Sequence, residues 1–397
     1  MRILWLSGNP SLYTEPKGYN GGGWISSLQQ AIKNSRYASG LTLGIAFLWT
    51  DSFKDEKDDC VYYGIKNKRS LNYKKKEASV KDEISKVISD FTPDVIHVFG
   101  TETILGVVTE ITAIPVVIHI QGMLNAYREA WMPQGLSWSK YLSWHPMEYL
   151  YKKLLDRNCD RELDMYHNCR HFMGRTVWDK GIVELLSPKA EYHYCSEMLR
   201  PVIYNSDRIW QRREHSKKRI ISIISSPVYK GGDVILRVAK LLKKYADFDF
   251  EWIVYGMSNL IDMQKLTGVA AKDVSVYTMG IISANQLVDE MINADIYVHP
   301  SYIENSPNTV CEAQVLGIPV IATHVGGVET LIHNNVDGLV VPGNDVYTMA
   351  IQIKKVIMNS ELAIHLGKNG RMEALPRHNP KIIVDDLVSC YRKMLRE

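Results

Sequence analysis

The sequence is poor in several features whose abundance would indicate a specialised class of protein. Its 397 residues include only six cysteines, none of them in a CxxC pair, and its net charge is only +3. Cysteines scattered in this way are most simply reduced thiols, and a charge this close to balance does not indicate a nucleic-acid partner. No apolar run reaches the roughly 18 residues that a membrane-spanning helix needs. The opening apolar stretch, Ile3–Leu6, is too short for the core of a signal peptide, so we expect a cytoplasmic protein.

Short apolar runs alternate with helix-length amphipathic segments along the whole chain. This alternation predicts parallel sheets with helices on both faces, and the length of 397 residues predicts two domains. The strand-like runs of the first half are Ile3–Leu6, Leu43–Trp49, Val95–Val98 and Pro115–Ile120. Those of the second half are Ile220–Ile224, Trp252–Tyr255, Val274–Tyr277, Ile296–His299, Pro319–Thr323 and Leu339–Val341.

A charged stretch without apolar residues, QRREHSKKR, begins at Gln211 and separates the two halves. We therefore expect an α/β protein with two doubly wound, Rossmann-like domains, residues 1–210 and 211–380. Residues 381–397 form a further amphipathic segment, which predicts a C-terminal helix.

Two acids, Glu304 and Glu312, stand out in the second half, with seven residues between them. The first follows the predicted strand Ile296–His299 through a short loop, and the second lies inside a predicted helix, about 308–317, that begins just after Pro307. The amides at a helix N-terminus can hold phosphates, and carboxylates can accept hydrogen bonds from sugar hydroxyls. This arrangement favours a nucleotide-sugar as ligand.

The same stretch resembles the E-x7-E region of retaining family 4 glycosyltransferases, which have the two-domain GT-B architecture. The resemblance extends through most of the chain and is supported by further segments in the same order. These segments are MRILWLSGNP with GGGW, PDVIHVFG, IPVVIHIQG, HFMGRTVWDKG with YCSEMLR, and YKGGD. HFMGRTVWDKG and YCSEMLR are similar to a subgroup that builds bacterial surface polysaccharides. In such enzymes a C-terminal helix crosses back onto the N-terminal, acceptor-binding domain.

The resemblance implies roles for individual residues on the donor side. Glu304 would contact the donor sugar near the reaction centre, and Glu312 would bind the ribose hydroxyls. Lys230, followed by two glycines, would neutralise the leaving diphosphate, so Glu304 and Lys230 are the predicted catalytic residues. The remaining predicted donor-binding residues are Asn305, Ser306, Asn308, Thr309, Gly22 and Gly23.

Two positions depart from the family pattern. The family usually has an arginine a few residues before the lysine, but Ser225 and Ser226 occupy those positions here. We therefore expect Lys230 and helix amides to balance most of the diphosphate charge. Many members also place a histidine directly before the turn that ends IPVVIHIQG. Here Gln121 holds that position and His119 lies two residues earlier on the same strand face, so either could contact the sugar.

The sequence predicts no metal. His167, Cys169, His171, His193 and Cys195 are suitable ligand types, but their spacing matches no common zinc motif. Asp247 and Asp249 spell the DxD of metal-dependent glycosyltransferases, yet they precede a strand, on the side opposite to where Rossmann ligands bind.

The first half also carries a lysine-rich run around residues 66–76 and an aromatic, basic stretch, WSKYLSWHPMEYLYKK, over residues 138–153. Basic and aromatic residues suit a membrane surface, although a simply solvated face explains them equally well. These stretches leave open a peripheral contact with the cytoplasmic face of the inner membrane.

The sequence thus predicts a retaining glycosyltransferase that requires neither metal nor other cofactor. Its donor would be an NDP-sugar, with UDP-hexoses first among the candidates, and its acceptor a glycan or lipid-linked sugar in bacterial polysaccharide biosynthesis. Two alternatives remain open: a GT-B NDP-sugar epimerase or hydrolase, and a non-catalytic sugar-nucleotide-binding partner of another transferase. No nucleic-acid partner is expected.

Overall fold

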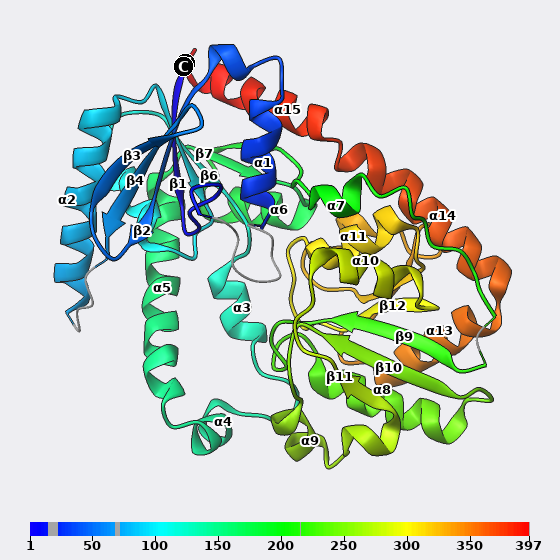
Figure 1. Cartoon of the computed structure of the whole chain (residues 1–397). Coiled ribbons are helices and arrows are strands. Elements are labelled where there is room, and N and C mark those ends of the chain that lie inside the picture. Colours follow the sequence, from blue (N-terminus) through cyan, green and yellow to red (C-terminus); the bar gives the residue numbers. More distant parts are fainter. Residues whose placement is uncertain (15–22, 68–71, 215, 397) are drawn as a thin grey trace.

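The computed structural model describes residues 1–14, 23–67, 72–214 and 216–396, and these form two sheets flanked by helices (Figure 1). The first sheet has strand order β3-β4-β2-β1-β5-β6-β7-β8. Its strands are β1 Arg2–Ser7, β2 Thr42–Trp49, β3 Phe53–Lys57, β4 Cys60–Lys66, β5 Val95–Phe99, β6 Val116–His119, β7 His171–Gly174 and β8 Glu191–Tyr194. All neighbours in this sheet are parallel except the hairpin between β3 and β4.

The second sheet is entirely parallel and has strand order β11-β10-β9-β12-β13-β14. Its strands are β9 Lys218–Ile223, β10 Phe250–Tyr255, β11 Val276–Thr278, β12 Ile296–His299, β13 Val320–Thr323 and β14 Leu339–Val341. Two α/β units with parallel sheets confirm the predicted fold class. Each predicted strand of the second half overlaps one of these six strands.

Four strands of the first sheet are absent from the sequence prediction. Strand β3 has the sequence FKDEK, and four of its five residues are exposed, so it lacks the apolar alternation that marks a strand. Strands β7 and β8 have the sequences HFMG and EYHY, which lack the aliphatic run that marks the predicted strands.

The helices before the second sheet are α1 Gly23–Lys33, α2 Tyr73–Phe91, α3 Leu124–Ala130, α4 Trp138–Trp144, α5 Glu148–Asn168, α6 Val177–Leu186 and α7 Pro201–Tyr204. Those that follow are α8 Gly232–Tyr245, α9 Ile261–Thr267, α10 Ala284–Ile292, α11 Asn308–Leu316, α12 Val328–Leu331, α13 Val346–Met358, α14 Ser360–Arg377 and α15 Pro380–Met394. Short 3-10 turns lie at Ala38–Gly40, Ile104–Glu110 and Ala271–Val274. Within the described ranges, none of the helices combines the length and apolarity that crossing a bilayer requires.

The last helix returns to the first sheet. Helix α14 packs against α11 of the second half, whereas α15 shares a buried cluster with α1 and β1 (Figure 1). Tyr391 of α15 is fully buried, and its hydroxyl accepts a 3.1 Å hydrogen bond from the Trp5 indole. The same hydroxyl lies 2.6 Å from Nδ1 of His97 on β5. Two consecutive helices therefore tie the two halves of the chain together.

Candidate active site

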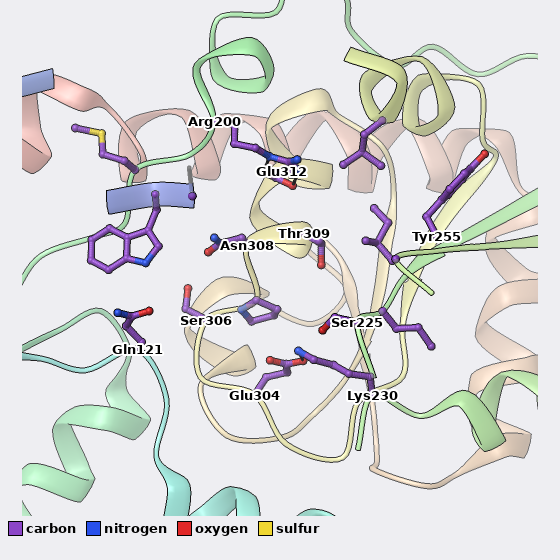
Figure 2. Close-up of a pocket in the computed structure, with 18 of the residues that line it drawn as sticks. Gln121, Arg200, Ser225, Lys230, Tyr255, Glu304, Ser306, Asn308, Thr309 and Glu312 are labelled. Carbon is purple, nitrogen blue, oxygen red and sulfur yellow. Dashed lines mark hydrogen bonds and ion pairs between the residues drawn. The ribbon is translucent and has the colours of Figure 1, made fainter. Parts of the chain in front are cut away.

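A cavity of about 370 Å³ lies between the two halves, with walls from both (Figure 2). On one side it is bounded by the loops that follow β9 and β12 and by the start of α11. On the other side it is bounded by residues that follow β6, β7 and β8, among them Gln121, Arg175 and Arg200. Each contribution comes after the carboxyl end of a parallel strand, which is where open α/β sheets bind their ligands.

Glu304 lies at one end of this cavity and is 3% exposed. Its Oε1 accepts hydrogen bonds from the Ser301 hydroxyl at 2.9 Å and forms an ion pair with Nζ of Lys230. Nε2 of His299 lies 2.9 Å from the same oxygen. Burial alone would raise the pKa of Glu304, but the Lys230 charge and the His299 contact outweigh burial and lower the pKa to about 2. Glu304 is therefore ionised at neutral pH.

Lys230 reaches Glu304 because two loops approach unusually closely. Gly231 has a positive φ of 75°, and a Cβ at this position would lie 2.1 Å from the carbonyl oxygen of Pro300. Gly326 has a φ of 52°, and the amide of Gly327 donates to the Glu304 carbonyl at 3.0 Å. Only glycine tolerates this backbone geometry without strain. Glycine at these positions thus allows the loop after β9 and the turn after β13 to pack closely against the loop that carries Glu304.

Glu312 lies at the other end of the cavity, where its carboxylate pairs with the guanidinium of a residue from a distant part of the chain. Arg200, just before α7, donates from Nε to Oε1 at 2.7 Å and from Nη2 to Oε2 at 2.6 Å. Parallel bonds of this kind fix the carboxylate plane. Glu312 is 2% exposed; burial raises its pKa above the ordinary value, and Arg200 opposes that effect. The predicted helix is confirmed as α11, with Glu312 inside it.

A second buried ion pair lies beside this one. Nε of Arg175 is 2.5 Å from Oε2 of the fully buried Glu197, and the Arg175 guanidinium lies over the Trp24 ring at 5.3 Å. The Ser306 hydroxyl donates to Oε1 of Glu197 at 2.6 Å. Burial would raise the pKa of Glu197, but the charge of Arg175 overcomes it, so the pKa is lowered. Glu197, which follows β8, thus joins Arg175 after β7 to Ser306 in the loop before α11.

The sequence pointed to Arg175 only as a substitute for Lys230 and gave no site role to Glu197 or Arg200, although all three lie in segments quoted for the resemblance. The one sign in the sequence that these residues belong to the site was that they are charged residues within those quoted segments. The structure places Arg175 and Arg200 on the cavity wall together with Lys230. Lys230 is therefore accompanied on the wall by two guanidinium groups, each of which is paired with a buried carboxylate.

The other predicted donor-side residues lie around the start of α11. Ser306, Asn308, Thr309 and Gly23 line the cavity, whereas Gly22 falls outside the described residues. The Asn305 side chain instead bridges to the first half: its Oδ1 accepts from Thr176 at 2.7 Å, and its Nδ2 donates to Asp179 at 3.1 Å. Its side chain is therefore engaged in contact between the two halves.

Gln121 and His119 occupy different environments. Gln121 lines the cavity. His119 is fully buried behind Trp24, with 4.9 Å between the two ring centroids, and burial lowers its pKa well below the ordinary value. Of the two side chains, Gln121 is the one at the cavity wall.

Asp247 and Asp249 of the DxD sequence lie elsewhere. Asp247 accepts from Lys354 at 2.6 Å and Asp249 from Lys243 at 3.3 Å, both on the exposed surface. Neither belongs to the cavity wall.

Comparison of the whole chain with solved structures shows the same architecture. Sucrose-phosphate synthase from Thermosynechococcus elongatus aligns with a TM-score of 0.74 at 16% identity, covering 100% of this chain and 99% of that one. The lipopolysaccharide glycosyltransferase WaaG aligns with a TM-score of 0.64 at 16% identity, covering 96% and 99%. The fold is therefore that of a GT-B glycosyltransferase.

A known family matches part of the sequence. Residues 206–373 match the family described as glycosyl transferases group 1, which confirms the predicted resemblance. CapM, a capsular polysaccharide biosynthesis glycosyltransferase of Staphylococcus aureus, is 33% identical over 105 residues, covering 26% of this chain and 28% of CapM. AmsK, an amylovoran biosynthesis glycosyltransferase of Erwinia amylovora, is 28% identical over 144 residues, covering 34% and 35%. The chain spans between 25% and 51% of the length of the curated relatives that it matches.

Proposed function

We propose that this protein is a retaining, metal-independent glycosyltransferase that transfers a hexose from a UDP-sugar to a glycan or lipid-linked acceptor during bacterial surface-polysaccharide assembly. The observation that carries the proposal is the cavity between the two halves, which holds Glu304 with Lys230 at one end and Glu312 with Arg200 at the other. Both acids stand in the E-x7-E arrangement around the start of α11.

The charge pattern of the cavity fits a nucleoside diphosphate. Lys230, Arg175 and Arg200 bring three cationic donors to the wall, each paired with a carboxylate, and the amides at the start of α11 add a partial positive charge. In this arrangement Glu312 accepts the ribose hydroxyls while Arg200 holds its carboxylate plane. The solved structure of HepE from Anabaena with UDP-glucose, a neighbour with a TM-score of 0.65 at 14% identity, supports a UDP-sugar as the first donor to test.

Transfer in this cavity would depend on electrostatics and positioning. As the sugar–phosphate bond breaks, negative charge grows on the diphosphate, and Lys230 with the two guanidiniums stabilises it without a divalent ion. Glu304, ionised beside Lys230, orients that ammonium and accepts hydrogen bonds from the sugar ring. Gln121 contacts the sugar from the opposite wall. The acceptor hydroxyl attacks from the face on which the diphosphate departs, which retains the anomeric configuration.

The acceptor side offers a surface suited to a membrane. Met147 at the N-cap of helix α5 and Leu150 and Leu154 within that helix are 81%, 63% and 46% exposed and follow one another at spacings of three and four residues, which places them on one face. Lys152 and Lys153 accompany them. We propose that this face contacts the anionic cytoplasmic leaflet, which suits a lipid-linked acceptor. A Campylobacter jejuni relative named for a diphospho-undecaprenol acceptor, 24% identical over 200 residues, supports this choice.

A donor screen followed by product analysis tests the proposal. Thermal unfolding is measured with UDP-, GDP- and ADP-hexoses, since a ligand at about 100 times its dissociation constant adds about 2.7 kcal/mol of stability. The donor that stabilises the protein is then incubated with lipid-linked acceptor, and the anomer formed is determined by NMR. Release of free UDP without acceptor would instead indicate a hydrolase or epimerase, and binding without turnover would indicate a non-catalytic partner.

A further inference from the structure

Three side chains converge at the edge of the first sheet, away from the cavity. His171 and Glu191 are the first residues of the paired strands β7 and β8, and His193 follows two residues along β8. Residues two apart on a strand share a face, so all three lie on the face that α15 covers. The two imidazoles are nearly buried, at 7% and 9% exposed.

The ligand atoms of these residues surround a common point. Nδ1 of His171 lies 3.4 Å from Nε2 of His193, and each of these nitrogens lies 3.8 Å from Oε2 of Glu191. A separation of 3.8 Å is too long for a nitrogen–oxygen hydrogen bond. The centre of a triangle with these sides lies about 2.1 Å from every corner, which equals the bond lengths of zinc to histidine nitrogen and carboxylate oxygen.

We propose that His171, His193 and Glu191 form a binding site for a divalent transition metal, with Zn²⁺ as the best match. Two imidazoles and one carboxylate are a known zinc donor set. The spacing along the chain gave no sign of this site, because the third ligand is Glu191 and the strand pairing, not the sequence, brings it to His171. The sequence predicted no metal. The proposal changes that expectation only for these three residues and not for the sugar-nucleotide cavity.

The surroundings of the three residues fit such a site. Lys393 of α15 forms an ion pair with Oε1 of Glu191, which leaves Oε2 turned toward the two imidazoles. Partners of this kind orient ligands and are a regular part of metal sites. A cavity of about 490 Å³ lined by His171 and Met394 lies next to the point, and water in it would supply a further ligand.

The position implies a structural role. Arg175 at the sugar-nucleotide cavity follows the carboxyl end of β7, four residues beyond His171, which corresponds to about 13 Å along a strand. A metal at the amino end of β7 therefore lies outside the transfer site. It would fasten the β7–β8 edge beneath the end of α15, and chelation should lower thermal stability while leaving the transfer rate of the folded enzyme unchanged.

Zinc binding by four proteins tests the proposal: the wild type, His193→Gln, Glu191→Gln and, as a matched control, His167→Gln. His167 belongs to the same sequence cluster but is exposed at the end of α5. Each protein is stripped of metal, freed of chelator and titrated with Zn²⁺ by calorimetry. The wild type and His167→Gln should bind one equivalent more than the other two variants. In His193→Gln and Glu191→Gln, the affinity of the proposed site for Zn²⁺ should fall by more than 10–100-fold, which is the cost of losing a residue that only hydrogen-bonds to a metal ligand.

Two further measurements use the same proteins. Zn²⁺ should raise the melting temperature of the wild type and His167→Gln only, and Co²⁺ should give them alone the visible absorption of a tetrahedral ion. Equal stoichiometry and affinity in all four proteins would overturn the proposal and leave a hydrogen-bonded cluster. If His193→Gln does not fold, Glu191→Gln decides, since its side chain is 30% exposed and its shape is preserved.

Discussion

The two acids of the cavity differ in the source of their counter-charge. Glu304 is neutralised by Lys230, whose loop follows β9 in the same sheet unit. Glu312 is neutralised by Arg200, which follows β8 and precedes the second sheet altogether. Their pKa values move in opposite directions: that of Glu304 is lowered to about 2, whereas that of Glu312 is raised by burial. One end of the cavity is therefore complete within a single sheet unit, while the other depends on how the two halves meet.

This difference suggests a division of labour. The Lys230 end is built from closely packed glycine loops of one sheet unit and suits the place where charge grows during transfer. The Arg200 end forms only when the segment before α7 lies against α11, so it suits recognition of the donor nucleotide. The following changes test whether the two ends are as different as their geometry indicates.

The largest effect is expected from Arg200→Met. Removing one partner of a buried ion pair leaves an uncompensated charge on Glu312, and such changes cost about 3–5 kcal/mol of unfolding free energy. Urea denaturation measures this cost. Arg208→Met is the matched control, because the Arg208–Asp289 pair lies in the same segment but is 48% exposed on both sides, and exposed pairs contribute less than about 1 kcal/mol. Equal losses in the two variants would contradict the distinction.

Lys230→Ala should lower kcat by about 10²–10³-fold, with a smaller change in donor KM. The ammonium acts on charge that develops only as the diphosphate leaves, and loss of one comparable electrostatic donor has that effect in other enzymes. Steady-state kinetics with the donor identified by the screen measure it, and Lys243→Ala on the exposed face of α8 is the control. A variant within a few-fold of wild-type kcat would transfer the role to Arg175 and Arg200.

The opposite pKa shifts predict opposite pH dependences. Because the folded-state pKa of Glu304 is lowered from 4.5 to about 2, the wild type should exceed Glu304→Gln in unfolding free energy by about 3 kcal/mol above pH 4.5. That advantage should disappear as the pH falls toward 2. For Glu312, whose pKa is raised, the difference between wild type and Glu312→Gln should decline as the pH rises above 4.5. Denaturation between pH 3 and pH 8 measures both slopes, and parallel slopes would refute the contrast.

Glu312→Ala should weaken UDP binding by roughly 10–100-fold, the value of a charged hydrogen-bonded contact. Glu304→Ala should leave UDP binding nearly unchanged and mainly lower turnover, so each variant serves as the control for the other. Calorimetry with UDP gives the binding constants. If UDP binds Glu312→Ala as tightly as the wild type, the ribose assignment is wrong.

The smallest effect is expected from EDTA. It should leave the initial rate of transfer by the folded enzyme unchanged. In the proposed mechanism, Lys230 and the two guanidiniums take the place of a divalent ion at the diphosphate. The rate is measured before and after chelation at a temperature well below unfolding. Activity that disappears in EDTA and returns with Mn²⁺ would contradict metal independence.

The sequence was sufficient for the parts of the site that are local. Glu304, Lys230 and Glu312 lie next to strands and a helix whose periodicity is visible in the chain, so the strands and α11 were predicted correctly. Arg200 lies 112 positions from Glu312, and no periodic pattern links them. Gln121 and His119 are two residues apart, so the sequence places them on the same strand face. Only the packing of Trp24 over His119 shows that His119 is buried and that Gln121 lies at the cavity.

Helix α15 has a consequence for the order in which the molecule is made. Tyr391 fills the core beside Trp5, and Leu387 and Met394 belong to the same buried cluster. Translation runs from the amino end, so β1 leaves the ribosome long before its partner helix does. That face of the first sheet must therefore wait, covered only in part by α1, while the whole second sheet is synthesised, and the half that is made first of the two is completed last.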